Sequence, residues 1–274
     1  MRSVLLYRAT LTPKEEIAAA QSAGFFCTSS RMQIKTDDIV IGRFSVLPFY
    51  REQETDILSV GAHLVNSLLE HDYVADLRNY VADLKELTPK TWFRLEDVPK
   101  DGGPFVLKGA TNSKKSAWKT HMYAANFSEA VKVHSRLMED GLIGDQNIYV
   151  RQYVPLFKLG EILNGMPLTE EYRIFVYCGK ILSSGFYWDA YHDDVIEQYG
   201  SIPRLEDADI RMEQLLHAAI KRIGDHVPFY AIDIAHKADG GWMIVELNDG
   251  QMSGLSANKP DMLYQNLFKV MNSY

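Results

Sequence analysis

The stretch that most constrains the fold of this chain is Phe229–Ser256, with the sequence FYAIDIAHKADGGWMIVELNDGQMSGLS. In its first part, apolar residues surround one acid, Asp233. Because this run is short and contains β-branched residues, it predicts a buried strand. Residues 238–241 supply a glycine-containing turn, and Trp242–Leu247 is expected to form the second strand of a hairpin. The fold must therefore place a carboxylate on a buried strand, which is costly unless the acid has a partner.

Two further polar residues of this hairpin are expected at the same end as Asp233. Glu246 ends the second strand and Asn248 follows two positions later, so their side chains share one face. Hard oxygen donors of this kind suit Mg²⁺, which proteins hold through one or two carboxylates together with substrate phosphates. The alternative is an acid on a solvated strand face, followed by an ordinary turn at residues 248–250. The apolar residues around Asp233 favour the metal site, because they would otherwise bury an unpaired acid.

Length and composition set wide limits on the class of protein. A chain of 274 residues is long enough for one large or two smaller domains with ample core. The net charge of −7 argues against non-specific binding to nucleic acid. The two cysteines, Cys27 and Cys178, are not in metal-binding spacing, so a reducing cytoplasm is expected. No apolar run reaches the roughly 20 residues of a spanning helix, and no signal-peptide core begins the chain, so no membrane is expected.

Residues 1–75 have the pattern of a small α/β unit. A short strand is predicted at residues 4–7, and a helix from Lys14 to Ala23 that begins after a proline and ends at a glycine. A second buried strand, Asp38–Ile41, delivers Arg43 to its carboxyl end, where ligands of open α/β sheets gather. Arg43 is therefore a candidate for binding the substrate, and a plain surface cation is the alternative. Further helices are predicted around residues 61–69 and 75–87.

The middle of the chain contains a candidate phosphate-binding lysine. Residues 105–107 predict a strand that ends in Lys108, and the polar loop GATNSKKSAWK follows at residues 109–119 before a returning strand near residue 121. A lysine in this position can reach phosphates that the backbone N–H groups of a loop also bind. The alternative is a solvated strand end. The G-x-x-x-x-G-K-[ST] motif is absent, which argues against a P-loop NTPase.

The remaining segments predict strands and helices in alternation. A helix at residues 128–138 precedes a strand, Ile148–Val154, that ends before a proline. A second hairpin follows, with Glu171 and Arg173 on one face of its first strand. The alternative for these two residues is an ion pair worth under about 1 kcal/mol if exposed. An amphipathic helix over residues 207–226 and a final helix from Pro260 complete the prediction.

Taken in order, these motifs resemble those of the ATP-grasp superfamily over about residues 76–274. Residues 1–75 are similar to the small α/β domain that precedes the ATP-grasp domain in such enzymes. The resemblance implies a mixed α/β (α+β) fold in which two α+β subdomains clasp ATP. The nucleotide-binding subdomain would cover about residues 90–154 and the metal-binding subdomain about residues 155–274.

The resemblance also implies a role for individual residues. For the nucleotide these are Lys108 on the phosphates, Lys90 as a first nucleotide-contacting lysine, Ser113 and Lys114 in the closing loop, Gln152, Tyr153 and Val154 along the adenine edge, Glu171 on the ribose and Arg173 near the terminal phosphate. Asp233, Glu246 and Asn248 would bind Mg²⁺, and Arg43 would hold the substrate carboxylate. The set Lys108, Arg151 and Arg173 is similar to that of a clade of phage and bacterial proteins defined by two arginines and a lysine.

This sequence departs from the family pattern at two places, and these departures affect which roles its residues can be assigned. The loop at residues 109–119 has one glycine where many relatives have a glycine-rich flap. Position 231 is alanine where several relatives place an arginine, so the anion-stabilising role there is assigned to Arg151.

The activity implied by the resemblance is that of an ATP- and Mg²⁺-dependent ligase that joins a carboxylate to an amine. The reaction would pass through an acylphosphate and release ADP and phosphate, with an amino acid, a peptide or another small molecule as substrate. The alternatives are a phosphotransferase, that is a kinase, and a catalytically idle ATP-binding module. An intact set of metal donors favours an active enzyme. The oligomeric state is left open.

Overall fold

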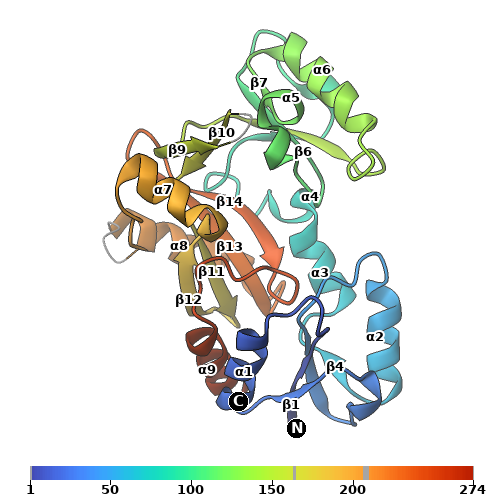
Figure 1. Cartoon of the computed structure of the whole chain (residues 1–274). Helices are drawn as coiled ribbons and strands as arrows, with labels where there is room; N and C mark the ends of the chain where they lie inside the picture. The colour runs from blue at the N-terminus through green and yellow to red at the C-terminus, as the bar shows by residue number, and fades with distance from the viewer. Residues whose placement is uncertain (1, 163–164, 206–209, 274) are drawn as a thin grey trace.

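The computed structural model describes residues 2–162, 165–205 and 210–273, whose strands form three four-stranded sheets and one two-stranded sheet (Figure 1). The first four-stranded sheet is parallel, in the order β2-β1-β3-β4, and belongs to the N-terminal unit of residues 2–75. Its elements are β1 (Arg2–Leu6), α1 (Lys14–Ala23), β2 (Phe26–Thr28), β3 (Asp38–Gly42), α2 (Tyr50–Ser59), β4 (His63–Leu64) and α3 (Leu68–Ala75). The predicted α/β character of this unit agrees with this arrangement.

The second sheet is antiparallel, in the order β5-β8-β6-β7, and forms the upper lobe in Figure 1. Its elements are β5 (Thr91–Trp92), β6 (Phe105–Gly109), α5 (Trp118–His121), β7 (Tyr123–Ala124), α6 (Phe127–Met138) and β8 (Ile148–Gln152). Helix α6 begins one residue before the predicted range, and the side chain of Asn126 caps it by accepting from Glu129 N–H. Helix α6 turns Ala130, Val133 and Leu137 towards the core at helical spacing.

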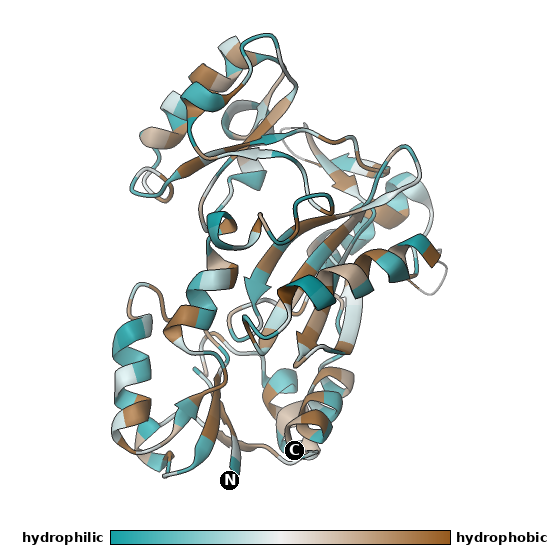
Figure 2. Cartoon of the chain, turned by 180° about the vertical axis from the view of Figure 1, so that it is seen from behind, coloured by the Kyte–Doolittle hydropathy of each residue, from teal (hydrophilic) through white to brown (hydrophobic). Residues whose placement is uncertain are grey.

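The third sheet, in the order β12-β11-β13-β14, lies at the centre of the molecule, and the small sheet β10-β9 lies beside it (Figure 1). The elements of this half are β9 (Lys158–Ile162), β10 (Met166–Thr169), β11 (Glu171–Tyr177), β12 (Lys180–Phe186), α7 (His192–Tyr199), α8 (Ile210–Ile223), β13 (Phe229–His236), β14 (Trp242–Asp249) and α9 (Pro260–Met271). The predicted beginning of the long amphipathic helix, at residues 207–209, lies outside the described residues. Helices show apolar and polar stripes in Figure 2, as expected of helices with one face on a core. None of the described helices is both long and apolar enough to span a membrane.

One face of the central sheet supplies both core and site. Phe175 and Tyr177 of β11, with Phe229 of β13, pack into the core that α9 covers. Side chains two positions apart point to the same face of a strand. Arg173 therefore lies on the same face of β11 as Phe175, and Asp233 lies on the same face of β13 as Phe229.

Two helices predicted near the end of the N-terminal unit are wrong in their extent. Residues 61–69 hold strand β4 and the beginning of α3, which a capping box of Ser67 and Glu70 fixes. The helix predicted for residues 75–87 shrinks to α4 (Leu77–Tyr80). Beyond it the chain follows β14 instead, since Ile244 N–H donates to Leu87 O at 2.7 Å and Thr88 Oγ1 donates to Ile244 O at 3.0 Å. Tertiary hydrogen bonds thus outweigh local helix preference.

Arg43 connects the N-terminal unit to the rest of the chain. Its Nε lies 2.6 Å from Glu16 Oε1, and its Nη1 donates to the carbonyls of Gly250 and Gln251 at 2.7 and 2.8 Å. Tyr264 of α9 donates its hydroxyl to the same oxygen of Glu16 at 2.5 Å. These contacts bury the guanidinium and assign it to the junction between α1, α9 and the loop after β14. They lend no support to the predicted substrate role of Arg43, which stays a prediction.

Removing this cation should destabilise the fold. Arg43→Met leaves Glu16 buried without its ion partner, and we expect a loss of roughly 3–5 kcal/mol in the free energy of unfolding, measured by urea denaturation. Arg31→Met is the matched control, because Arg31 pairs with Asp56 on an exposed surface, and its loss should cost under about 1 kcal/mol. An Arg43→Met protein that keeps its stability but loses activity would favour the substrate role instead.

Candidate active site at the junction of two sheets

The residues predicted to bind metal lie on neighbouring strands in register. Arg173 of β11 stands opposite Asp233 of β13, and Asp233 stands opposite Glu246 of β14. Arg173 donates from Nε and Nη2 to the two carboxylate oxygens of Asp233 at 2.8 and 2.7 Å. Asn248 Nδ2 donates to Asp233 Oδ2 at 3.1 Å. The hairpin thus brings the predicted donors together at one end, next to an arginine bound in the strong bidentate geometry.

Lys108 reaches this row from the second sheet. Its Nζ lies 2.5 Å from Glu246 Oε2, so the ion pair connects β6 to β14. Burial acts to raise the pKa of Glu246, but the charges of Lys108 and Lys115 outweigh it and hold that pKa well below its usual range. The carboxylate of Glu246 is therefore ionised, and the cations Lys108 and Lys115 compensate its charge.

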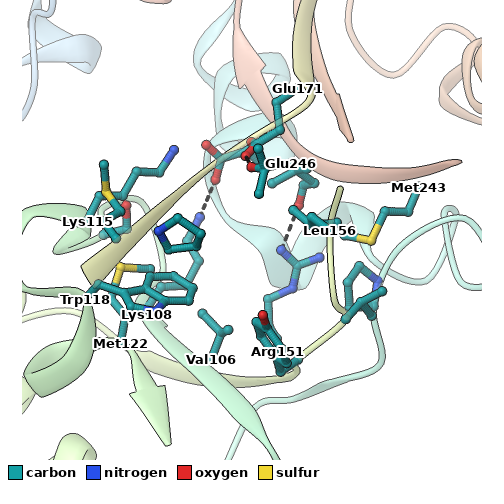
Figure 3. A pocket seen from close by; sticks show the side chains of 18 of the residues that line it. Val106, Lys108, Lys115, Trp118, Met122, Arg151, Leu156, Glu171, Met243 and Glu246 are labelled. Atoms are coloured by element: carbon teal, nitrogen blue, oxygen red, sulfur yellow. Dashed lines mark hydrogen bonds and ion pairs between the residues drawn. The ribbon is translucent and has the colours of Figure 1, made fainter. Parts of the chain in front are cut away.

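A first cavity of about 200 Å³ opens between the second sheet and the central sheet (Figure 3). One part of its lining is apolar, with Val106, Trp118, Met122, Val154, Leu156, Met166, Met243 and Val245. The other part is charged, with Lys108, Lys115, Arg151, Glu171 and Glu246. In Figure 3 the carboxylates of Glu171 and Glu246 lie on the opposite side of the cavity from Trp118 and Val106. The cavity thus suits a ligand with a flat apolar body and an anionic end.

The loop at residues 109–119 contributes Ser113 and Lys115 to the first cavity. Lys115 Nζ donates to the Tyr187 hydroxyl at 2.6 Å and lies 5.0 Å from the centroid of the Trp188 ring. Burial acts to lower the pKa of Lys115, but interactions with Tyr187 and nearby carboxylates raise it above the usual range. Lys114, the predicted residue, instead pairs with Asp140 at 2.8 Å and is not among the residues that line the cavity. The two lysines therefore point to different partners.

The predicted adenine-binding residues, 152–154, all line the first cavity. Gln152 N–H donates to Lys90 O at 2.8 Å, and Tyr153 N–H donates to Pro104 O at 3.0 Å. These two amides are therefore used within the protein. The exposed side chain of Lys90 lies 5.1 Å from the centroid of the Trp92 ring and does not line the cavity. Its predicted contact with the nucleotide stays a prediction.

Glu171, predicted to bind ribose, is buried at the edge of the first cavity. Its Oε1 accepts hydrogen bonds from Thr169 Oγ1 and, at 3.2 Å, from Trp188 Nε1. Burial raises the pKa of Glu171, although Lys115 and the hydrogen bond from Thr169 act against this. The acid is thus held in a fixed orientation, with its charge poorly solvated.

Arg151 lines the first cavity from β8. Its Nη1 donates to Val245 O and its Nη2 to Thr88 Oγ1, both at 2.7 Å. Nε of Arg151 is buried and has no hydrogen-bond partner among the described residues. Burial lowers the pKa of Arg151, although Tyr80 and Glu246 act to raise it. Its predicted anion-stabilising role remains a prediction, since two of its three donor nitrogens already bond to protein groups.

The donor set is compatible with Mg²⁺. Among the described residues, no group of three His, Cys, Asp or Glu side chains forms a metal cluster. The predicted set consists of two carboxylates and an amide, and Mg²⁺ commonly takes one or two protein carboxylates and completes its shell with phosphates and water. The register of Asp233 against Glu246 places both carboxylates at one end of the hairpin. Metal binding by this set stays a prediction that the chemistry of the donors supports.

A second cavity lies on the other side of Arg173 and Asn248. Its lining consists of Ser45, Leu47, His71, Ala75, Thr111, Arg173, Asn248, Asp249, Met252, Ser253 and Gly254. The N-terminal unit, the loop after β6, and strands β11 and β14 all contribute to it. The row of charged residues on the central sheet therefore lies between the first cavity and this second cavity of about 230 Å³.

Sequence reasoning missed Lys115, Tyr187 and the second cavity. The loop at residues 109–119 was singled out, but a polar loop has no periodicity that tells which of two adjacent lysines faces inward. Tyr187 directly follows strand β12, and no sequence motif marks it as a site residue. His71 lies in a segment whose helix was placed too early in the chain, so its contact with Asp249 could not be foreseen.

The fold matches solved structures over almost its whole length. D-cycloserine synthetase DcsG matches with a TM-score of 0.60 and 14% identity, over 99% of this chain and 100% of that one. The ATP-grasp ligase PsnB, complexed with a minimal precursor, Mg and ADP, matches with a TM-score of 0.56 and 9% identity, over 99% and 97%. An L-amino acid ligase from Bacillus licheniformis matches with a TM-score of 0.55 and 11% identity, over 98% and 74%. The fold is therefore that of the ATP-grasp proteins, which confirms the fold predicted from the sequence.

The family match is more specific than the fold. Residues 97–267 match the family described as ATP-grasp domain, R2K clade family 3, and the chain belongs to this family. The predicted resemblance to a two-arginine-one-lysine clade is thereby confirmed. No curated protein sequence matches the chain significantly.

The two adjacent lysines of the loop allow a controlled test of the site. Lys115→Ala should lower kcat/KM for ATP at least tenfold, about 1.4 kcal/mol, because the buried ammonium faces the charged part of the first cavity. Lys114→Ala should change kcat/KM by less than twofold, since its ammonium pairs with Asp140 away from the cavity. Steady-state release of ADP measures both. Equal losses in the two variants would contradict the orientation seen in the structure.

Proposed function

We propose that this protein is an ATP- and Mg²⁺-dependent ligase that joins a carboxylate to an amine through an acylphosphate. The observation that carries the proposal is the row of Arg173, Asp233 and Glu246 between two cavities, one with a lining suited to a nucleotide and one with a mixed polar and apolar lining. A phosphoryl group passed from the first cavity to the second must cross this row. Phosphoryl transfer needs positioning and charge stabilisation more than covalent help from the protein.

In this proposal ATP binds in the first cavity. The adenine lies among Val106, Trp118 and Met122, and the backbone of residues 152–154 reads its edge. Glu171 accepts a hydrogen bond from the ribose. Lys108 and Lys115 bind the phosphates, so that Lys108 exchanges its present partner, Glu246, for a phosphate oxygen. Such an exchange keeps the lysine charge compensated throughout.

Asp233, Glu246 and Asn248 would hold Mg²⁺, which supplies charge neutralisation at the phosphate oxygens. Arg173 keeps Nε and Nη2 on Asp233, and its Nη1 donates to Gly254 O at 3.0 Å; Arg173 and Gly254 both line the second cavity. A planar guanidinium can bind two oxygens of a phosphoryl group at once, which a lysine cannot. Arg173 is therefore assigned to the group in transfer.

The proposed reaction has two steps. A carboxylate oxygen attacks the γ-phosphorus of ATP, the bond to ADP breaks, and an acylphosphate forms. The amine nitrogen then attacks the acyl carbon, a C–N bond forms, and phosphate leaves while the nitrogen loses a proton. Both reactants of the first step are anions, so the cations Lys108, Lys115 and Arg173 lower its barrier electrostatically.

The class of substrate is proposed to be an amino acid or a short peptide. This rests on structurally similar proteins: a synthetase of D-cycloserine, an L-amino acid ligase and a ligase complexed with a precursor peptide. The polar and charged residues in the lining of the second cavity, such as Arg173, Asn248 and Ser253, agree with a polar group as the reacting end.

The reaction class can be tested by following oxygen. Purified protein is screened for ADP release with each amino acid, alone and with short peptides, and the active carboxylate is then prepared with ¹⁸O in its carboxyl group. We expect one ¹⁸O to appear in inorganic phosphate, because the carboxylate oxygen bridges carbon and phosphorus in the intermediate. AMP and pyrophosphate as products would refute the proposal in favour of adenylation. A stable phosphorylated product without an amide would favour a phosphotransferase. ATP binding without any turnover would favour a catalytically idle ATP-binding module.

Arg173 provides a second test. Arg173→Lys should lower kcat at least tenfold while KM for ATP changes by less than threefold, because the lost bidentate contact belongs to the transition state. Steady-state kinetics at saturating substrate separate the two constants. A rise in KM for ATP with unchanged kcat would instead assign Arg173 to ground-state nucleotide binding.

A further inference from the structure

A buried imidazole lies in the second cavity and has no role in the proposed phosphoryl transfer. His71 of α3 lines this cavity together with Arg173 and Asn248. Its Nδ1 lies 3.0 Å from Asp249 Oδ2, and both side chains are almost fully buried. The pair joins the N-terminal unit to the end of β14, directly after the predicted metal-binding residues.

The imidazole is held in one orientation from two sides. The Tyr50 ring stacks on it with centroids 4.3 Å apart and an interplanar angle of 18°. Asp249 is itself fixed, since its Oδ1 accepts from Asn66 Nδ2 and from Gln251 N–H, both at 2.8 Å. With Nδ1 on the carboxylate, Nε2 is the remaining ring nitrogen, and none of the described residues forms a hydrogen bond with it. A carboxylate that orients a histidine in this way leaves Nε2 as the proton acceptor.

We propose that the second cavity binds the amine substrate and that His71, oriented by Asp249, accepts the proton that the amine loses. This inference rests on the proposed ligase function and adds a catalytic residue to it. As the nitrogen attacks the acyl carbon, the C–N bond forms and the C–O bond to phosphate breaks, with the electron pair leaving on phosphate. The proton moves from nitrogen to Nε2 and later to water. The charge of the imidazolium is compensated by Asp249 at 3.0 Å.

The surroundings of His71 suit a group that changes charge. Asp249 is its direct partner, Tyr50 of α2 covers its ring, and Arg173 of β11 lines the same cavity. Glu70 lies on the same helix, one residue before His71, and Glu54 lies on α2 next to the N-terminus of α3. Of the charged residues named here, Asp249 and Arg173 line the second cavity with His71, and Asp249 is the anion in direct contact with the ring.

The test separates the two chemical steps with two amine probes. Both amines lose a proton on forming the C–N bond, but hydroxylamine is mostly unprotonated at pH 7 and captures acylphosphates rapidly without an enzymatic base, whereas glycinamide is mostly protonated at that pH and depends on a base to accept its proton. The carboxylate is chosen from the amino acids and short peptides by hydroxamate formation with ATP and wild-type protein. His71→Gln should keep the hydroxamate rate within twofold and lower the glycinamide rate at least a hundredfold, the usual scale of general base catalysis. The wild-type glycinamide rate should fall on the acid side, and the variant should lose this dependence.

Each outcome decides between the inference and the proposed function. If the wild type forms no hydroxamate with any amino acid or short peptide, the proposed function fails and the inference with it. If His71→Gln lowers both rates equally, or neither, the function stands and the role of His71 is overturned. A wild type that forms hydroxamate but uses no glycinamide would also overturn the assignment of the second cavity to amines of this class.

A second variant tests the cavity without altering any titratable group. Ala75 lines the second cavity at the end of α3, and Ala75→Leu fills space there with a good helix former. We expect it to raise KM for glycinamide at least tenfold and to leave the reaction with the smaller hydroxylamine within threefold. An unchanged KM for glycinamide would overturn the placement of the amine, whether or not His71→Gln folds.

Discussion

The contact between Arg173 and Asp233 is the interaction on which the arrangement of the site depends. Two hydrogen bonds between buried, oppositely charged groups fix β11 against β13 at the point where Glu246 stands one strand further on. Removing either partner would leave an uncompensated charge in the core, which costs several kcal/mol. The ion pair is thus formed before any ligand binds, and it fixes the positions of the neighbouring side chains of Glu246 and Asn248. A metal or a phosphate at this site meets groups that are already oriented, which reduces the reorganisation that binding requires.

The charges of the site are balanced within the protein by pairs that span different parts of the fold. Lys108 crosses from the second sheet to Glu246, and Lys115 reaches Tyr187 from the loop after β6. A nucleotide that enters the first cavity would take over these two lysines. The same contacts that hold the lobes together in the free protein would then hold the nucleotide between them. Under the proposed function, nucleotide binding would therefore use the same cations that connect different parts of the fold in the free protein.

Much of the fold and part of the site follow from the sequence, and the exceptions have a common cause. The hairpin with Asp233 and Glu246 was predictable because alternation and a glycine turn are local signals. The path of residues 81–89 was not, because hydrogen bonds to β14 decide it. The choice of Lys115 over Lys114 also escaped prediction, as did the burial of Arg43. In each of these cases the outcome depends on which distant element packs against the residue, and no local pattern records that.

One face of the central sheet carries both core residues and site residues, and this limits which insertions and deletions can be tolerated in evolution. The strands that carry Arg173 and Asp233 also carry Phe175 and Phe229 into the core under α9. Deleting one residue within such a strand would move both sets to the opposite face, so the core and the charged row would be lost together. Tolerated insertions and deletions should therefore be confined to the connecting loops. Lineages that acquire new substrates would do so by altering the loops and the N-terminal unit around the second cavity, while the length of these strands stays constant.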